Sequence, residues 1–322
     1  MNGSAIVRWT GSGRIEDLEL SVRNIIRSRR LKGRMVRNGG SIVVSGSDPV
    51  RIAELFRHLP GVRWLAVGFP VDSTESLKEG TSVLAKRYLR PGRKFVVISE
   101  VSGMAGPASD LTGTANFAIL DAVRKVRTDE SRPDITFRLA KDGANGAVGV
   151  QIIDGPGGNP SRSEKAGCLV SGGVHSSVLA WMTLVAGYSV ELVHAMVEDE
   201  SVRAVARLYA ELSHRVDPTR LSIRVIEGGA IPGMLCAWVG RFSGLAFGGF
   251  KAGGAVIPNG LRAVRMPLWL LPEEDFQREF AGLALKDHKR GQNWAEKRKG
   301  EVKSRTYGGK RADVSAVLDG LR

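Results

Sequence analysis

The residues best suited to chemistry form a loop rich in glycine and serine near the middle of the chain. Residues 167–177 read Gly-Cys-Leu-Val-Ser-Gly-Gly-Val-His-Ser-Ser, an apolar run that passes into small residues. Apolar residues then recur over 178–184 with helical spacing, which predicts a buried strand, a tight turn and a helix capped by Ser176 or Ser177. The N–H groups at a helix N-terminus attract anions, and glycines allow a close approach. The segment therefore predicts a phosphate-binding turn.

The elements after this loop predict a twisted parallel α/β sheet. Residues 189–196 and 221–226 read as further strands, and residues 199–216 read as an amphipathic helix. In such sheets ligands bind at the carboxyl ends of the strands, where the glycine-rich loop lies. His194 and Glu198 end the second strand, so they are candidates for nucleotide contact, with ordinary structural roles as the alternative.

The residues before the loop predict two smaller α+β domains. A chain of 322 residues is long enough for two or three domains. Residues 5–67 show a βαββαβ order, which is typical of a ferredoxin-like domain. Further helices near 76–88 and 110–126 and strands at 94–101, 134–141 and 147–153 follow, and the Gly/Pro/Ser-rich residues 154–161 predict a linker. We expect domains at 1–70, 71–160 and 161–285, with a basic tail over 286–322.

The positive charge of the chain is unevenly distributed. The formal net charge of +14 divides into +8 over residues 1–160, zero over 161–285, +7 over 286–311 and −1 over 312–322. This distribution predicts that a polyanion docks on the flanks, away from the neutral region with the loop, although surface solubility alone is the plain alternative. No apolar run approaches the roughly 20 residues that cross a bilayer, and the start lacks a secretion-signal pattern. We expect a cytoplasmic protein without a membrane partner.

Five segments together resemble the tRNA 4-thiouridine synthetases, which are the tRNA sulfurtransferases. They are Pro60-Gly61-Val62, Lys94-Phe95-Val96-Val97, Asp110-Leu111-Thr112-Gly113, Pro133-Asp134-Ile135-Thr136-Phe137-Arg138 and Ser171-Gly172-Gly173. The resemblance runs from about Ala5 to about Ala195, and it implies a ferredoxin-like domain, a THUMP domain and a PP-loop domain. It also implies that the first two domains grip tRNA, while the third activates the uridine at tRNA position eight with ATP before sulfur is inserted.

The loop itself resembles the SGGxDS loop of the PP-loop ATP pyrophosphatases, with His175 in the acidic position. The resemblance implies ATP and Mg²⁺ as cofactors, although imidazole is a poorer Mg²⁺ ligand than a carboxylate. The expected ATP-binding residues are Ser171, Gly172, Gly173, His175, Ser176 and Ser177, with Arg241 and Lys251 of the glycine-rich residues 228–260 as further phosphate contacts.

The family's sulfur chemistry implies a reactive thiol. The chain has two cysteines, which form no CxxC pair. Cys168 lies in the apolar run, where a thiol is usually inert, so Cys236 is the candidate catalytic residue. We expect no protein-bound metal cluster.

Cations concentrate at three places in the front half, and we expect them to contact RNA phosphates, which position an RNA without reading its bases. The candidate RNA-binding residues are Arg27, Arg29, Arg30, Lys32, Arg34, Arg90, Arg93, Lys94, Arg124 and Lys125. For each of them, a solvated cation at a helix end is the alternative. The tail over 286–311 interleaves Lys and Arg with Trp294 and Tyr307, which fits either an RNA-binding arm or a charged surface helix.

Two functions therefore stay open. The first is an adenylating enzyme of the thiouridine-synthetase type, with tRNA and a sulfur donor protein as partners. The second is a tRNA-binding protein with a degenerate PP-loop that assists a separate catalytic subunit. His175 and the scarcity of cysteine favour the second function, and the retained loop with its serines favours the first. A homodimer is compatible with both.

Overall fold

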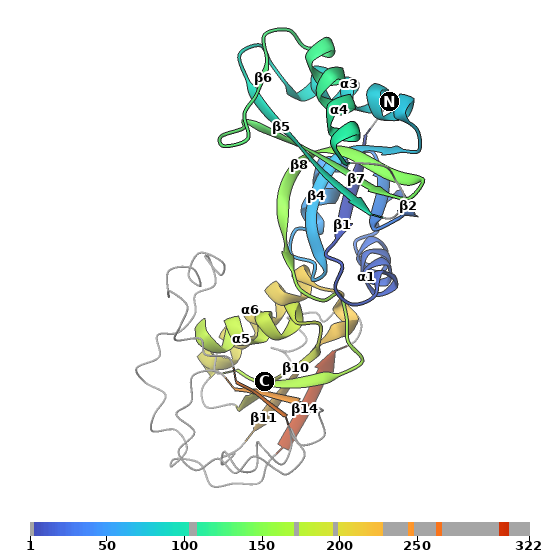
Figure 1. Cartoon of the computed structure of the whole chain (residues 1–322). Coiled ribbons are helices and arrows are strands. Elements are labelled where there is room, and N and C mark those ends of the chain that lie inside the picture. Colours follow the sequence, from blue (N-terminus) through green and yellow to red (C-terminus); the bar gives the residue numbers. More distant parts are fainter. Residues whose placement is uncertain are drawn as a thin grey trace. The chain divides into compact units, whose positions relative to one another are not determined.

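The computed structural model divides the chain into two compact units, Met1–Pro160 and Ser161–Arg322 (Figure 1). The structure describes residues 3–102, 108–170, 174–195, 199–227, 244–247, 262–265 and 303–308. Among these residues, no helix is both long and apolar enough to cross a membrane.

The first unit begins with the predicted βαββαβ order. Its elements are β1 (Ser4–Trp9), α1 (Ile15–Ser28), β2 (Gly33–Asn38), β3 (Ser41–Gly46), α2 (Pro49–Leu55) and β4 (Val62–Val71). Helix α2 begins where the Asp48 side chain accepts a hydrogen bond from the Arg51 amide at 3.0 Å, with Pro49 in the first turn. Helix α1 buries Leu18, Val22 and Ile25 along one face, as an amphipathic helix should.

The same unit continues with a second set of helices and strands. They are α3 (Thr74–Tyr88), β5 (Lys94–Ser102), α4 (Ala108–Ala122), β6 (Arg127–Thr128), β7 (Ile135–Asp142) and β8 (Asn145–Gly157). Strands from both predicted front domains join one eight-stranded sheet in the order β2-β3-β1-β4-β8-β7-β5-β6. Strand β4 pairs with β1 on one side and β8 on the other, so the sheet continues across residue 70. The division of the front half into two domains at this residue stays a prediction.

The predicted linker at residue 154 is wrong for its first four residues. Residues 154–157 continue β8, because β4 is long enough to pair with them, and Val62 stands opposite Gly157 in the register. Turn composition marks this segment, but the tertiary pairing decides its conformation.

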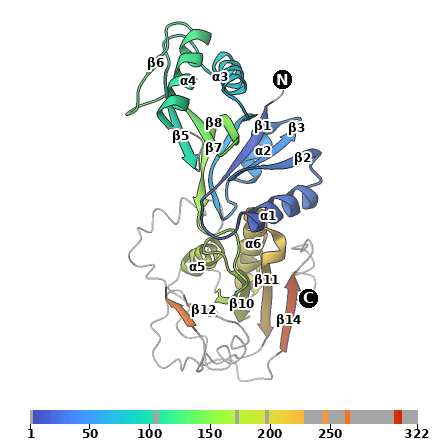
Figure 2. The same cartoon turned by 45° about the vertical axis from the view of Figure 1, so that its right-hand side comes forward.

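The eight-stranded sheet carries two apolar cores and a small inner cluster. Helices α1 and α2 pack over β1, β3 and β4, whereas α3 and α4 pack over β5, β7 and β8 (Figure 2). On the inner face, Ile6, Trp64 and Ala66 meet Ala140 and Ala147. Strands on opposite sides of the β4–β8 pair are thus in contact, so the sheet curls.

Polar contacts close the curl of the sheet. The Asn38 amide donates to the Gly146 carbonyl, and the Gly40 N–H donates to Asp142 at 2.7 Å. Gly39 between them has φ +60°, and a Cβ there would lie 2.6 Å from the Asp142 Cβ, so this turn requires glycine. The turn between β2 and β3 therefore packs directly on the turn between β7 and β8.

The second unit is built on a six-stranded sheet in the order β13-β12-β9-β10-β11-β14. Its elements are β9 (Lys165–Leu169), α5 (Val174–Val185), β10 (Ser189–Ala195), α6 (Asp199–Arg215), the 3₁₀ turn η1 (Pro218–Arg220), β11 (Leu221–Glu227), β12 (Gly244–Phe247), β13 (Arg262–Arg265) and β14 (Lys303–Gly308). The predicted α/β fold class is confirmed, and β9 to β13 are parallel as expected.

Strand β14 differs from the surface-helix alternative for the tail, whereas the RNA-binding arm stays a prediction. The strand pairs antiparallel with β11, so Lys303–Gly308 is a strand and not part of a surface helix. The alternation of cations with Ser, Thr and Tyr suits an edge strand.

Candidate nucleotide site and candidate RNA interface

The glycine-rich loop leaves the sheet at the carboxyl end of β9. The Val170 N–H donates to the Val193 carbonyl at 2.9 Å, which extends the pairing of β9 with β10 by one residue. Helix α5 then begins at Val174. Ser171, Gly172 and Gly173, which the sequence assigns to ATP, lie between these points and outside the described residues.

The position of β9 in the sheet makes this end a ligand site by topology. Strand β10 follows β9 through α5, and β11 follows β10 through α6, so the chain first progresses to one side of β9. Strand β12 then pairs with the other side of β9. Parallel α/β sheets bind ligands outside the carboxyl ends of strands at such a switch point. The switch point here lies at the carboxyl end of β9, which residues 171–173 follow in the sequence.

Ser176 and Ser177 lie inside the first turn of α5. Helix α5 begins two residues before Ser176, so the prediction that one of these serines is the helix cap is wrong. Both side chains are buried, at 4% and 0% exposed. The first turn of α5 therefore follows the carboxyl end of β9, and the N-terminus of a helix is a favourable place for an anion.

His194 is tied to the start of the loop. Its Nδ1 donates to the Val170 carbonyl at 2.8 Å, and the ring is buried. Burial lowers the pKa of His194 to about 4, although the bond to Val170 opposes this shift. The imidazole is therefore neutral near pH 7, and its contact with Val170 gives it a positioning role for the backbone that leads into the loop. Glu198, the other candidate on this edge, lies outside the described residues.

The Cys168 side chain packs in the apolar core, as the sequence predicts. Cys168 lies in β9 within the core formed with α5 and α6. Burial raises the pKa of this thiol to about 12, against the smaller effect of a hydrogen bond with Thr183. Cys236, Arg241 and Lys251 lie outside the described residues, although β12 ends at Phe247, four residues before Lys251, on the same edge as β9.

The sequence did not identify a buried carboxylate in β10. Glu191 is 1% exposed, accepts from Lys165 Nζ at 3.0 Å and is bonded by Arg224 Nε. The three residues lie on β9, β10 and β11, so they tie neighbouring strands together below the loop. A charged residue in the middle of the apolar run Ser-Val-Glu-Leu-Val was the available signal.

The first predicted RNA-binding group lies at the end of α1 and on the edge strand β2. Arg27, Arg29, Arg30, Lys32 and Arg34 are all exposed there. Neighbouring Arg23 and Arg37 are instead held by Glu19 and Glu16, each at 2.7 Å.

The second and third predicted groups form one surface. The Gly92 N–H donates to the Lys125 carbonyl at 2.7 Å, and β5 pairs with β6 so that Lys94 stands opposite Arg127. The C-terminal ends of α3 and α4 therefore lie together, as Figure 1 also shows. We call this surface the helix-end cluster, which comprises Lys86, Arg87, Arg90, Arg93, Lys94, Arg124, Lys125 and Arg127.

Members of the helix-end cluster differ in how many hydrogen bonds and ion pairs they make within the protein. Arg90 caps α3 by donating to the Lys86, Arg87 and Leu89 carbonyls. Arg93 pairs with Asp134 at 3.1 Å. Lys94 donates to Asp129 at 2.7 Å, and this bond lowers the pKa of Asp129 to about 2.

The cations at the end of α4 are less engaged. Arg124 and Lys125 are exposed and have no carboxylate within ion-pairing distance among the described residues. They are therefore the members best placed to meet a phosphate.

Metal ligands are not gathered in the part of the chain that the structure describes. No group of three or more His, Cys, Asp or Glu side chains there could hold a metal ion. The absence of a protein-bound metal cluster stays a prediction.

Solved structures share this fold at low sequence identity. The crystal structure of PH1313 from Pyrococcus horikoshii Ot3 matches with a TM-score of 0.64 and 18% identity, over 86% of this chain and 98% of that one. The crystal structure of a 4-thiouridine synthetase–RNA complex with bound ATP matches with a TM-score of 0.60 and 18% identity, over 88% and 86%. The chain therefore has the mixed α/β fold of these proteins.

Sequence comparison then points to one group of proteins. The chain is 26% identical over 190 residues to a protein named probable tRNA sulfurtransferase of Latilactobacillus sakei, covering 58% of this chain and 47% of that protein. It is 29% identical over 185 residues to the protein of that name from Brevibacillus brevis, covering 56% and 46%. No family model matches. The chain spans about half the length of these relatives, and the predicted resemblance to the tRNA sulfurtransferases is confirmed as that of a divergent relative.

Proposed function

We propose that this chain binds tRNA with its first unit and ATP at residues 171–177, and that it activates the uridine at tRNA position eight for sulfur transfer. The observation that carries this proposal is the position of the loop. It follows β9 at the switch point of a parallel sheet and runs into the N-terminus of α5. A helix N-terminus favours a phosphate, because its backbone N–H groups and the positive end of its dipole face the ligand.

The residues at this edge fit a nucleotide. The loop is made of Ser171, Gly172 and Gly173, which are small residues. When bound there, ATP would supply an adenylyl group to a carbonyl oxygen with release of pyrophosphate, and AMP would leave when the sulfur nucleophile attacks the activated carbon. His194 holds the Val170 carbonyl, so it fixes the backbone that leads into the loop.

Other parts of the proposal follow the relatives. The solved 4-thiouridine synthetase was crystallised with RNA and ATP, which supports tRNA as the substrate and ATP as the cofactor. Mg²⁺, a sulfur donor protein, a homodimer and a cytoplasmic location are included as proposals. Cys236 remains the proposed catalytic thiol, since Cys168 is buried with a raised pKa.

The alternative is a non-catalytic tRNA-binding subunit with a degenerate PP-loop. Two features favour it: His175 stands where the resembling loops have an acidic residue, and the one thiol that the structure describes is inaccessible. The two functions share tRNA binding and differ in whether ATP is cleaved.

A gel shift with an unmodified tRNA transcript, run beside photo-crosslinking of azido-ATP, tests the shared part. We expect a shift and a crosslink in the peptide that contains residues 166–203. A shift without a nucleotide crosslink would support the accessory subunit. The variant His175→Asp shows whether a missing crosslink is due to His175 alone or to a loss of the whole site. If the site is otherwise intact, the carboxylate should strengthen Mg²⁺-dependent ATP binding.

A further inference from the structure

An apolar stripe on the outer face of α4 is the most exposed hydrophobic feature that the structure describes. Phe117 is 69% exposed and Leu120 is 48% exposed. They are three positions apart, so their side chains are neighbours on one face of the helix. A single exposed apolar residue is ordinary, but an exposed aromatic beside a second large apolar side chain indicates a binding surface.

The opposite face of α4 already has its partner. Leu111, Ala115 and Ile119 are buried in the core shared with α3 and the sheet, and Ser82 of α3 donates to the Ala118 carbonyl at 3.4 Å. Phe117 therefore contributes nothing to that core, and its exposure is not explained by packing.

The stripe runs into the helix-end cluster. Arg124 follows Phe117 by seven positions and lies two residues past the end of α4 at Ala122. On α3, Val83 is 37% exposed and is followed by Lys86 and Arg87. Exposed apolar side chains thus precede cations in both segments, with Lys86 and Arg87 in the last turn of α3 and Arg124 and Lys125 directly after α4. The two segments meet where the Gly92 N–H donates to the Lys125 carbonyl.

We propose that Phe117 and Leu120 receive an unpaired nucleobase of the bound RNA, while Arg124 and Lys125 contact the phosphates next to it. This rests on the proposed tRNA binding and adds a site to it. Aromatic side chains stack on bases because every base has a π-face, and cations beside them neutralise the backbone. A stretch of RNA needs both an apolar surface for the base and cations for the phosphates. A purely apolar protein partner would not explain the surplus of cations. Asp121 is the acidic residue of this stretch, and it is outnumbered by the cations.

Binding of an unmodified tRNA transcript to the full chain tests the proposal through Phe117→Ala. Stacking on one base makes the expected loss of affinity about 10-fold. Phe117→Tyr should restore affinity to within about 2-fold, since it keeps the ring. Leu20→Ala is the matched control, because Leu20 of α1 is also exposed, at 52%, and lies away from this stripe in sequence.

Two further arms separate base stacking from other roles. A blunt RNA duplex without unpaired bases should bind the wild type and Phe117→Ala equally, and the dependence of affinity on salt should be the same for both proteins. Sedimentation should show the same oligomeric state for both.

The proposal is overturned if Phe117→Ala binds the transcript as tightly as the wild type, or if the duplex shows the same loss. It is also overturned if the variant changes only self-association, which would make the stripe a protein interface. Failure of the wild type to bind the transcript would instead remove the proposed function on which the stripe depends.

Discussion

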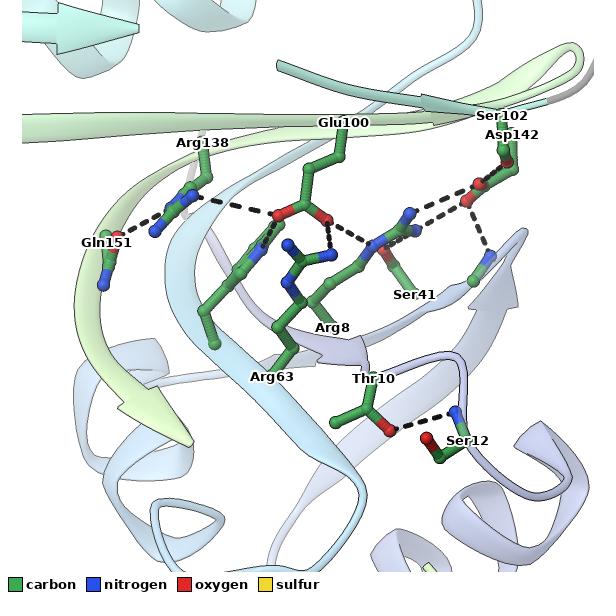
Figure 3. A network of polar contacts seen from close by, with 12 residues as sticks. Arg8, Thr10, Ser12, Ser41, Arg63, Glu100, Ser102, Arg138, Asp142 and Gln151 are labelled. Carbon is green, nitrogen blue, oxygen red and sulfur yellow. Dashed lines mark hydrogen bonds and ion pairs between the residues drawn. The ribbon is translucent and has the colours of Figure 1, made fainter. Parts of the chain in front are cut away.

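Arg8 and Asp142, which lie 134 positions apart in the chain, are joined by an ion pair of 2.6 Å inside the curled sheet. Arg8 of β1 also donates to Glu100 of β5 at 3.2 Å (Figure 3). Trp64 Nε1 donates to the same carboxylate at 2.9 Å. Burial alone would raise the pKa of Asp142, but hydrogen bonds from Arg8, Ser102 and the Gly40 amide outweigh it and hold that pKa below its usual value. These contacts join the β1–β4 part of the sheet to the β5–β8 part.

We therefore predict that Arg8 and Asp142 are energetically coupled. Both side chains are largely buried, at 10% and 18% exposed, so a double-mutant cycle of Arg8→Met and Asp142→Asn should give a coupling of about 1–3 kcal/mol. The exposed pair Arg14 and Glu16, 3.8 Å apart, is the control and should give less than about 0.5 kcal/mol.

Urea unfolding of the full chain measures this coupling, with hydrogen exchange in the β7–β8 turn as a local probe because the chain has two units. Equal couplings for the two pairs would show that the network does not hold the curl.

Cations without acidic partners should dominate RNA affinity. We predict that Arg124→Ser weakens tRNA binding and reduces the slope of log affinity against log salt by about one. Arg23→Ser should have a smaller effect, because Glu19 already holds Arg23 at 2.7 Å. Filter binding at several salt concentrations measures both slopes. A larger effect for Arg23 than for Arg124 would place the RNA elsewhere on the unit.

His194 should make the free energy of unfolding depend on pH between about 4 and 6.5. Its pKa falls from an unfolded value of 6.5 to about 4, so the unfolded state binds more protons between these values. The free energy of unfolding should therefore drop as the pH falls below 6.5, by about 2 kcal/mol between pH 7 and pH 5. His194→Asn, which keeps a donor for Val170, should remove most of this slope. An unchanged slope in the variant would contradict the assignment.

Cys168 should be unreactive in the native protein. With a pKa of about 12, the thiolate fraction at pH 8 is about one in ten thousand, and the side chain is fully buried. Iodoacetamide should label Cys168 only after urea is added, as mass spectrometry of its peptide can show. Rapid labelling of the native protein at Cys168 would mean that this thiol is accessible and is a candidate for the sulfur chemistry.

Much of the fold could be predicted from the sequence, because apolar runs alternate with capped helices. Helix α2 after Asp48-Pro49 and strand β10 were found in this way. The missed parts lack a local signal: β6 has only two residues, and residues 154–157 have the composition of a turn but are paired with β4. Strand β14 has no apolar run, and its pairing with β11 joins residues about 80 positions apart.

The candidate site could be predicted only in part for the same reason. The glycine-rich loop is local, so its place between β9 and α5 follows from the sequence. The pairing of β5 with β6 brings Arg90 and Arg124 to one surface. No short sequence pattern indicates this pairing. Glu191 was missed because its partners Lys165 and Arg224 lie on two other strands.

The most direct test of the account is the release of AMP from MgATP by the purified full chain, with and without unmodified tRNA. The account predicts AMP release that depends on tRNA and is lost in Gly172→Asp, since a side chain at this glycine would block the close approach of the phosphates. A clear gel shift with no AMP at any tRNA concentration would contradict the adenylating function, and it would support the non-catalytic tRNA-binding subunit.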